Sequence, residues 1–246
     1  MKIIIHGSTG RMGQNLIRAV EKKGHVLAAG VSVDQETNAA EKKYHSLPEF
    51  TGEADLIIDF SHHTAIGAVL EYAEERQLPV VIGTTGHTPE EKARIAAAAE
   101  RIPVFQSGNM SVGVALLVQL AKQTAKVFPD AEYEIVETHH NQKLDVPSGT
   151  ALMLADGIKT VRPGTTYNIG RPENGKRTAE EIGIHSLRMG NVVGVHEVQV
   201  CTGTQTITLK HEAHDRMLFA EGAVAAAEYL VQQSAAGLYN METMLA

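Results

Sequence analysis

The sequence predicts an α/β protein in which a parallel-sheet domain is followed by a second α+β domain. The first observation is a short apolar run, KIIIH, that leads into a glycine-rich turn and then a helical pattern. The second is the alternation of strand and helix patterns over residues 1–108. The third is a change after residue 108, where one long apolar helix precedes a series of strands separated by turn residues. Alternating elements build parallel sheets, and strands joined by short turns build antiparallel ones.

The glycine turn at residues 7–13, GSTGRMG, predicts a dinucleotide-binding site. Gly7 permits the tight turn, Gly10 lets the backbone approach a pyrophosphate, and Gly13 lets the next helix lie close against the strand. A GxxGxxG string alone is weak support, but the strand before it and the helix after it are the context that the motif requires. We therefore expect residues 1–108 to form a Rossmann-like domain that binds NADH, NADPH or both.

An acidic residue follows the second predicted strand, residues 25–33. Asp34 stands 21 positions after Gly13, close to the spacing of about 20 at which an acid contacts the ribose of a dinucleotide. An Asp at the end of a strand is also a common turn residue, so both interpretations stay open. A bond from Asp34 to the 2′-hydroxyl favours NADH, whereas Lys42 and Lys43 are near enough in sequence to reach a 2′-phosphate.

Two further turns are candidate cofactor contacts because they follow predicted strands of the parallel sheet. Strand patterns cover residues 55–59, 79–82 and 103–105, with helices over residues 63–76 and from Thr88 onward. Ligands of such sheets bind at the carboxyl ends of the strands, where residues 83–85 and 107–110 emerge. A plain turn explains the first of these segments equally well.

The second domain is expected over residues 109–215, with a mixed, largely antiparallel sheet. One face of this sheet needs cover, for which a helix over residues 219–231 is a candidate. By analogy with two-domain dehydrogenases, the C-terminal helix of residues 216–246 is expected to return to the first domain. The remaining predicted elements are a helix at 112–127, strands at 133–138, 182–188, 192–202 and 206–210, and a long mobile loop at 159–181.

Residues 137–151, ETHHNQKLDVPSGTA, concentrate proton donors and anion binders. His139 and His140 titrate near neutral pH, and Lys143 carries a fixed positive charge. Ser148 is placed to cap a helix whose free N–H groups and dipole attract carboxylate or phosphate. This combination suits an anionic substrate that needs a proton. The alternative is a strand followed by a capped helix, with histidines that are merely solvated.

The motif HHxxKxDxPSGTA, after a GxxGRMG start, resembles the 4-hydroxy-tetrahydrodipicolinate reductase family. The resemblance implies NAD(P)H-dependent reduction of that cyclic dicarboxylate to tetrahydrodipicolinate in lysine and diaminopimelate biosynthesis. It also implies a homotetramer built through the second domain. Further similar segments are DFS at 59–61, GTTG at 83–86, NMSVG at 109–113, IGIHSxR at 182–188 and FAxGA at 219–223.

The resemblance also assigns roles to individual residues. It makes His139 the proton donor, Lys143 its catalytic partner, and it implies that the substrate carboxylate is bound by His140, Gly149 and Thr150. Hydride delivered to an electron-poor ring carbon leaves negative charge that a nearby acid must neutralise, and a histidine with a pKa of about 6.5 suits this task. The implied cofactor contacts are Gly7, Ser8, Thr9, Gly10, Arg11, Met12, Asp34, Gly83, Thr84, Thr85, Ser107, Gly108, Asn109 and Met110.

Three positions depart from the family pattern. Val195 stands where the family usually has Glu, and Gly108 replaces a usual Ala or Pro. Gln35 follows Asp34 where some members have an Arg that binds the 2′-phosphate. The last departure leaves dual use of the cofactors or a preference for NADH open.

Composition and charge agree with a globular enzyme of 246 residues, 43% hydrophobic and 21% charged. The net charge of −7 argues against nonspecific nucleic-acid binding. No stretch is long and apolar enough to span a membrane. The start MKIII enters the first strand directly and the single Cys201 excludes an intrachain disulfide, so a cytoplasmic protein is expected.

Other chemistries fit the sequence less well. The pairs His62–His63 and His139–His140 are adjacent rather than spaced as helical metal ligands, so no metal is expected. Cys201 is predicted to lie in the core, which disfavours a thiol nucleophile. No tyrosine has a lysine four positions later, as short-chain dehydrogenases require. A non-catalytic cofactor-binding sensor stays open as a rival. His6 is predicted to be a packed or turn-bonded residue, and structure or subunit contacts are predicted for His185, His196, His211 and His214.

Overall fold

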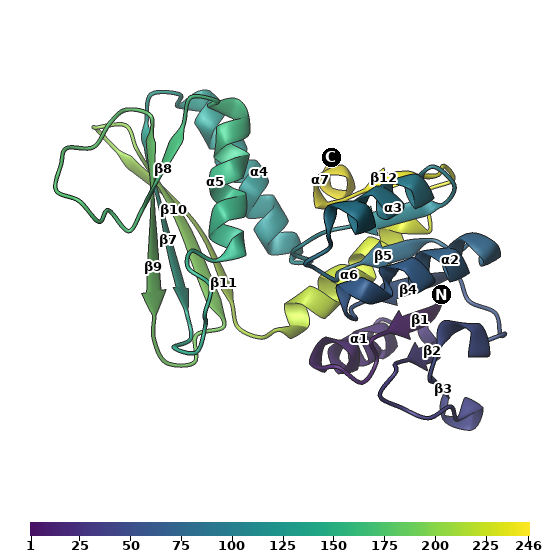
Figure 1. The fold of residues 1–246 in the computed structure, drawn as a ribbon. Helices are drawn as coiled ribbons and strands as arrows, with labels where there is room; N and C mark the ends of the chain where they lie inside the picture. Colours follow the sequence, from purple (N-terminus) through teal and green to yellow (C-terminus); the bar gives the residue numbers. More distant parts are fainter. The chain divides into compact units, whose positions relative to one another are not determined.

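The computed structural model describes all 246 residues and divides into two compact units. Unit 1 comprises Met1–Ser111 and Met217–Ala246, and unit 2 comprises Val112–Arg216. Figure 1 shows the elements of each unit with their labels. The boundary drawn from the sequence, at Gly108, lies three residues before the division at Ser111. None of the helices is long and apolar enough to cross a bilayer.

Unit 1 contains a seven-stranded parallel sheet in the order β12-β6-β5-β4-β1-β2-β3. The order reverses at β1, which has β2 on one side and β4 on the other, so the carboxyl ends of these strands form the crevice where dinucleotides bind in such folds. The Rossmann-like prediction is confirmed. The strands are β1 (Lys2–His6), β2 (Val26–Val31), β3 (Lys43–Tyr44), β4 (Leu56–Asp59), β5 (Val80–Ile82), β6 (Pro103–Gln106) and β12 (Gly237–Tyr239).

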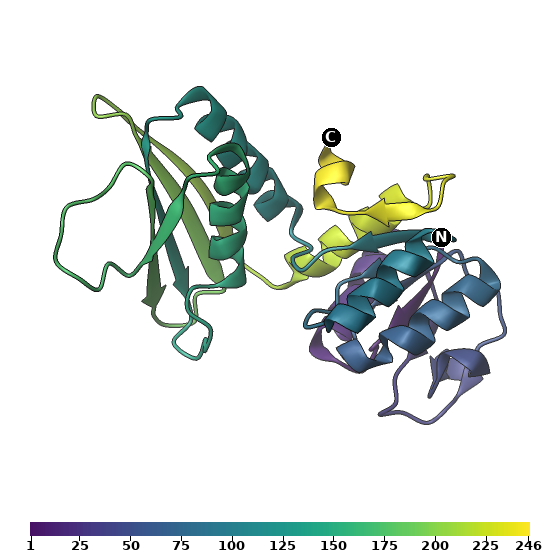
Figure 2. The ribbon, with the colours of Figure 1, turned by 45° about the horizontal axis from the view of Figure 1, so that its top comes forward.

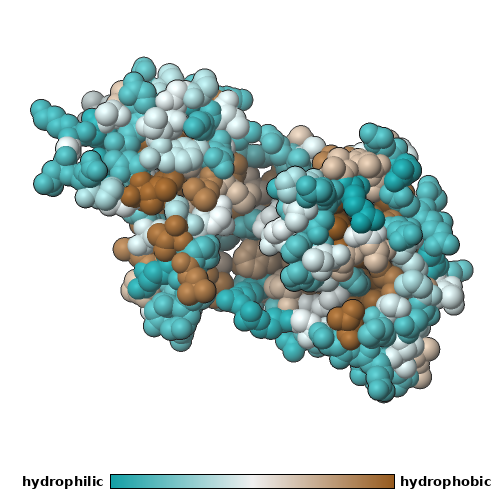
Figure 3. Space-filling model, viewed as in Figure 1, coloured by the Kyte–Doolittle hydropathy of each residue, from teal (hydrophilic) through white to brown (hydrophobic).

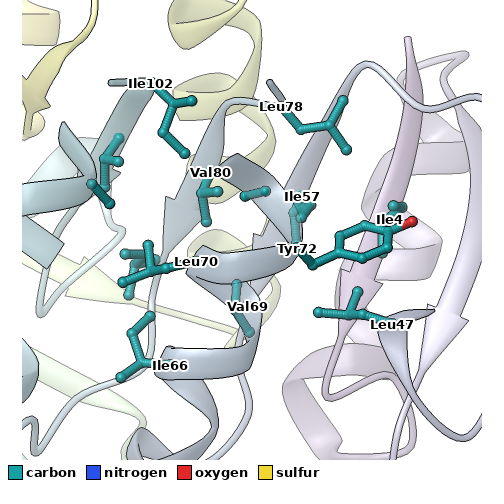
Figure 4. Close-up of a cluster of buried hydrophobic side chains, with 14 of the residues drawn as sticks. Ile4, Leu47, Ile57, Ile66, Val69, Leu70, Tyr72, Leu78, Val80 and Ile102 are labelled. Carbon is teal, nitrogen blue, oxygen red and sulfur yellow. The ribbon is translucent and has the colours of Figure 1, made fainter. Parts of the chain in front are cut away.

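Helices cover both faces of this sheet (Figure 2). Ile3, Ile4 and Ile5 of β1 are all fully buried, as expected for a strand covered on two sides. Figure 4 shows the core on one side, where Ile4 and Ile57 of the sheet pack with Val69 and Tyr72 of α2. The helices of unit 1 are α1 (Arg11–Lys22), α2 (Ile66–Arg76), α3 (Pro89–Ala99), α6 (Met217–Leu230) and α7 (Met241–Leu245), with 3-10 turns η1 (Ala39–Glu41), η2 (Leu47–Glu49) and η3 (His63–Ala65).

Unit 2 is a five-stranded mixed sheet in the order β11-β10-β7-β9-β8, with two helices on one face (Figure 1). β10 runs antiparallel to β7 and β11, whereas β9 runs parallel to β7 and β8. The prediction of a second domain with a mixed sheet is confirmed. The elements are α4 (Val112–Val127), β7 (Glu132–His139), α5 (Gly149–Val161), β8 (Thr166–Ile169), β9 (Glu181–Arg188), β10 (Gly194–Cys201) and β11 (Thr206–Ala213).

The side chains of β7 alternate between the two faces of this sheet. Tyr133, Ile135, Glu137 and His139 are buried, and the residues between them are half-buried. Tyr133 and Ile135 share a core with Leu117 of α4 and other residues of both helices. Figure 3 shows brown, apolar atoms interrupting the polar surface of unit 2. Its exposed large apolar residues are Leu116, Leu120, Val127, Leu144, Val146, Ile169, Leu187 and Met189.

Three predictions from the sequence are wrong in detail. The proposed loop over residues 159–181 is interrupted, because α5 extends to Val161 and the edge strand β8 follows it. The helix predicted at 219–231 is α6, which packs on α1, β5 and β6 of unit 1 rather than covering the sheet of unit 2. α4 and α5 already cover that sheet. Cys201 is half-buried rather than a core residue.

Candidate active site

A pocket of about 400 Å³ lies at the carboxyl ends of β1, β2 and β4 in unit 1. Its volume falls within the range of small-molecule sites. Four of the predicted cofactor residues line it: Gly7, Thr9, Gly10 and Asp34. The other lining residues are His6, Ser32, Val33, Phe60, Ser61, His62, Thr64 and Ala65. The pocket therefore occupies the crevice that the strand order predicts.

The glycine turn has no room for side chains at two of its positions. Gly7 has φ +84°, and a Cβ on it would lie 2.5 Å from the carbonyl oxygen of Phe60. A Cβ on Gly13 would lie 2.2 Å from the carbonyl oxygen of Gly7. Gly10 precedes α1 and no side chain caps the helix, so its first N–H groups are available to an anion. This cradle fits the pyrophosphate of a nicotinamide dinucleotide.

A buried carboxylate lies at the carboxyl end of β4, beside this pocket. Asp59, which is 1% exposed, pairs with His6 Nδ1 at 2.7 Å and accepts hydrogen bonds from the hydroxyls of Ser61 and Thr84, both at 2.6 Å. The Thr84 side chain, a predicted cofactor contact, thus points to Asp59. Only a glycine fits at position 83 beside Phe60, because a Cβ on Gly83 would lie 2.2 Å from the Phe60 ring.

The residue after Asp34, Gln35, does not line the pocket. The side-chain amide of Gln35 donates to the carbonyl oxygens of Gly30 at 2.7 Å and Tyr44 at 3.0 Å. Both acceptors belong to the sheet edge formed by β2 and β3. Asp34 itself lines the pocket with Ser32 and Val33. At the position where some family members have an arginine, this chain therefore has a glutamine whose side chain is hydrogen-bonded to the backbone of the sheet.

The remaining predicted cofactor residues lie outside the lining of this pocket. Ser107 and Asn109 bond to one another in the turn after β6, with the Ser107 hydroxyl donating to the Asn109 carbonyl at 2.7 Å. Met110 is buried, while Arg11 is exposed at the first position of α1. The others are Ser8, Met12, Gly83, Thr84, Thr85 and Gly108.

In unit 2, His139 ends β7 and pairs with a second buried carboxylate. Its Nδ1 lies 2.5 Å from Oε2 of Glu137, which is fully buried. Glu137 also accepts two hydrogen bonds of 2.9 Å from Arg188 and one of 3.2 Å from the backbone N–H of Ser148. Burial alone would raise the pKa of Glu137, but the hydrogen bonds from His139 and Arg188 outweigh it and hold the pKa well below its usual range.

Glu137 is therefore a carboxylate, and it accepts the hydrogen on Nδ1 of His139. The reactive nitrogen of the ring is then Nε2. A Cβ on Gly194 would lie 3.1 Å from this atom, so the glycine leaves the space beside Nε2 open. This geometry suits a histidine that gives or takes a proton at Nε2.

The helix α5 starts next to this pair, as the sequence predicts. The Ser148 hydroxyl accepts the backbone N–H of Ala151 at 3.2 Å and so caps the helix. No atom lies within 4 Å of a Cβ built on Gly149, and Thr150 is half-buried. The partial positive charge at the start of a helix favours an anion there.

Lys143 lies in the loop between β7 and α5. Its Nζ pairs with Asp145 at 2.8 Å, and this hydrogen bond lowers the pKa of Asp145. The Lys143 side chain is 19% exposed, whereas that of Asp145 is 60% exposed. His140 is half-buried in the same loop. The structure thus places the predicted residues of the histidine motif on one continuous segment around the start of α5.

His196 is a part of this site that sequence reasoning assigned to structure or subunit contacts. Its Nε2 lies 3.0 Å from the Ser148 hydroxyl, and its ring packs edge-on against His139 with centroids 5.0 Å apart. Burial, followed by the positive charge of His139, lowers the pKa of His196 to about 3. A neutral ring therefore separates His139 from β11.

Glu137 and Arg188 had no predicted role. Both lie on the face of the sheet that carries His139, and Arg188 is paired with His139 in the β7–β9 register. A Glu two residues before the histidine on the same strand was the available signal. The structure contains no group of three or more His, Cys, Asp and Glu side chains suited to a metal ion.

Comparison with known families decides which group of proteins has this arrangement. Residues 1–110 match the family described as dihydrodipicolinate reductase, N-terminus, and residues 113–245 match dihydrodipicolinate reductase, C-terminus. The chain belongs to the dihydrodipicolinate reductase family. The predicted resemblance is confirmed.

Relatives in the dihydrodipicolinate reductase family are similar over their whole length. The 4-hydroxy-tetrahydrodipicolinate reductase of Caldanaerobacter subterraneus subsp. tengcongensis is 42% identical, over 100% of this chain and 98% of the relative. That of Rickettsia rickettsii is 40% identical, over 98% of each chain. A dipicolinate-bound dihydrodipicolinate reductase from Paenisporosarcina sp. TG-14 has the same fold, with a TM-score of 0.83 and 24% identity over 98% of this chain and 97% of that one.

Proposed function

We propose that this chain is an oxidoreductase that reduces 4-hydroxy-tetrahydrodipicolinate to tetrahydrodipicolinate with NAD(P)H, in lysine and diaminopimelate biosynthesis. The observation that carries this proposal is the His139–Glu137 pair beside the open start of α5, in a chain of the dihydrodipicolinate reductase family. The substrate and product names differ by one hydroxyl group. The difference balances when the ring first loses water, which takes the hydroxyl group and a neighbouring ring hydrogen, and a hydride and a proton then add to the double bond that is formed.

The pocket of unit 1 supports the cofactor half of this reaction. The nicotinamide of the bound dinucleotide supplies the hydride. The backbone around Gly7 and Gly10 is proposed to hold the pyrophosphate, and Asp34 a ribose hydroxyl. The other contacts that the family implies do not line this pocket, and they are proposed to touch the cofactor when it is bound.

His139 is the proposed proton donor. Hydride addition to the electron-poor ring leaves negative charge on the conjugated system, and Nε2 of His139 provides the proton that removes it. Glu137 holds the other ring nitrogen at 2.5 Å. Gly194 keeps side chains away from Nε2.

The start of α5 is the proposed binding site for a substrate carboxylate. The N–H groups of Gly149 and Thr150, with the helix dipole behind them, favour an anion there. Lys143 adds a positive charge that supports the reacting ring electrostatically, and His140 is a further carboxylate contact. Asp145 accepts a hydrogen bond from the Lys143 ammonium at 2.8 Å, which orders the Lys143 side chain before substrate binds.

The first experiment is a coupled assay in which a synthase makes the unstable substrate from pyruvate and aspartate semialdehyde. We expect the absorbance of the reduced nicotinamide to fall only when synthase, both precursors and this protein are present. Tight cofactor binding without turnover would instead favour a cofactor-binding sensor.

We further propose that NADH is the preferred cofactor. Asp34 lines the pocket, where it favours a free 2′-hydroxyl, and the next side chain, Gln35, is tied to the carbonyls of Gly30 and Tyr44 instead of offering a cation to a 2′-phosphate. The ratio of kcat/KM for NADH to that for NADPH should exceed one. Asp34→Asn should lower this ratio by about tenfold, the value of one hydrogen bond to a charged group. A ratio below one in the parent chain would contradict the preference.

The second domain supports a proposed homotetramer of a cytoplasmic enzyme. One face of its sheet is covered by α4 and α5 and the other is not, and Leu187 on the uncovered face is 50% exposed. Light scattering in solution should give a mass four times that of the 26.5 kDa chain. The mass of a single chain would contradict this proposal.

A further inference from the structure

Glu137 connects three segments of unit 2. Its carboxylate contacts His139 at the end of β7, Arg188 at the end of β9 and the backbone N–H of Ser148 at the start of α5. Arg188 also donates to the Asp145 carbonyl at 2.8 Å and so reaches the loop that carries Lys143. This buried ion pair therefore contacts the proposed proton donor, the start of α5 and the loop that carries Lys143.

We propose that Glu137 and Arg188 are positioning residues that set the proton donor and the anion-binding helix start in one fixed arrangement. Glu137 holds Nδ1 of His139, so the proton leaves from Nε2. The same carboxylate holds Ser148 N–H at 3.2 Å and thereby fixes where α5 begins relative to the ring. This inference rests on the proposed role of His139 as proton donor.

The number of hydrogen bonds on Glu137 explains why the arrangement is rigid. Its two oxygens accept four hydrogen bonds, from His139, from Arg188 twice and from Ser148, and the residue is fully buried. No oxygen of Glu137 is left for water. The Nδ1 side of His139 is therefore closed, and the proton that the ring loses must be replaced at Nε2 after the product has left.

Arg188 offsets the free-energy cost of burying the Glu137 carboxylate. A carboxylate removed from water without a cation would take up a proton or disrupt the fold. The guanidinium of Arg188 binds both oxygens of Glu137 in a forked geometry, at 2.9 Å each. A lysine could not bind both oxygens in this way while also donating to Asp145.

The chain offers a matched control on the same strand. Glu134 also pairs with an arginine and a histidine, at 2.6 Å from Arg177 and 2.8 Å from His185. It lies on the opposite face of β7, and its side chain is 28% exposed. It has neither a helix start nor the proposed proton donor as a neighbour. Glu134→Gln therefore removes an equivalent charge from β7 without touching the site.

The test is a double-mutant cycle with Glu137→Gln and His139→Gln, using NADH and substrate made by the synthase. Glu137→Gln should lower kcat by about 10- to 100-fold, the effect of losing a partner that orients a reactive imidazole. NADH affinity should not change. In the His139→Gln background, Glu137→Gln should have less than about a threefold further effect, because it acts through the ring. Glu134→Gln should keep parental kcat.

Two outcomes would overturn the proposal: additive losses in the double mutant, or parental kcat in Glu137→Gln. Nitrogen-15 NMR of the histidine rings gives a readout that is independent of turnover. The parent should show His139 with a hydrogen on Nδ1 in a strong hydrogen bond, and Glu137→Gln should lose this signal while Glu134→Gln keeps it. An unchanged His139 signal in folded Glu137→Gln would also refute the inference. No turnover by the parent, with this NMR pattern intact, would instead count against the proposed function alone.

Discussion

Each unit contains a buried carboxylate paired with a histidine, and the two pairs differ in what else surrounds the acid. In unit 1, Asp59 holds His6 at 2.7 Å, and its other partners are the hydroxyls of Ser61 and Thr84. In unit 2, Glu137 holds His139 at 2.5 Å, and its other partners are Arg188 and a helix N–H. Both histidines are the last residues of their strands, β1 and β7.

The different partners of the two carboxylates indicate that the two carboxylate–histidine pairs have different uses. Hydroxyl partners order a loop, and the segment they order includes Phe60 and Ser61 of the cofactor pocket. An arginine instead keeps the acid ionised, so its histidine is held by a full negative charge and is ready to carry a proton. We therefore propose that the first pair shapes a binding pocket and that the second prepares a reaction.

Replacement of His139 should have the largest effect on turnover. His139→Gln should lower kcat by about 10²- to 10⁴-fold, the contribution of a general acid. NADH affinity should be unchanged, because His139 belongs to unit 2. The coupled assay and a fluorescence titration with NADH measure the two quantities. Full turnover by folded His139→Gln would exclude it as the proton donor.

Replacement of the acid in unit 1 should affect binding rather than chemistry. Asn at position 59 keeps one acceptor oxygen, so at least one of the donors His6, Ser61 and Thr84 loses its partner, at a cost of about 1–3 kcal/mol. Asp59→Asn should therefore raise the dissociation constant for NADH by about tenfold and lower the melting temperature. At saturating NADH, kcat should stay within about threefold of the parent. A large loss of kcat with normal NADH affinity would reverse the roles of the two pairs.

A smaller change tests whether the space beside Nε2 of His139 matters. A methyl group at position 194 would lie 3.1 Å from this nitrogen, so the ring must shift by a few tenths of an ångström. Gly194→Ala should lower kcat by about fivefold, corresponding to roughly 1 kcal/mol of strain. Gly175→Ala, where nothing lies within 4 Å, is the matched control. Equal activity of the two variants would show that the space is not needed.

Local sequence patterns were sufficient to predict the glycine turn and the helix cap, but not the partners of the two buried carboxylates. The glycine turn and the cap at Ser148 depend on neighbouring residues, so periodicity and composition located them. Glu137 and Arg188 are 51 positions apart, and they meet only because β9 lies next to β7 in parallel register. The sequence pattern does not specify that register. His196 was missed for the same reason, since it reaches Ser148 through the β7–β10 pairing.

The errors in the fold also come from contacts between distant segments. The helix α6 is rich in small apolar residues, which predict burial but do not specify the sheet that buries them. Seven of its residues are buried, and it packs in unit 1. The strands β8 and β12 have four and three residues, too few for an alternating pattern to emerge. Asp59 was quoted only as part of a family motif, because its partners lie on β1 and after β5.

The last test concerns the neutral ring that packs against His139 in unit 2. His196 has a folded-state pKa of about 3, lowered first by burial, against 6.5 in the unfolded chain. Between these values the unfolded chain binds more protons than the folded one, so the free energy of unfolding falls as the pH falls. His87 and His211, whose pKa values are also lowered by burial, act with the same sign. The low pKa of Glu137 matters only below its unfolded value of about 4.5. The parent should thus lose stability from about pH 7 to about pH 5, and His196→Gln should lose up to about 1.4 kcal/mol less per pH unit. Urea unfolding followed by circular dichroism at several pH values measures both slopes. Equal slopes for the parent and His196→Gln would mean that His196 is not held neutral in the folded protein. The ring packed against His139 would then carry a positive charge in this pH range.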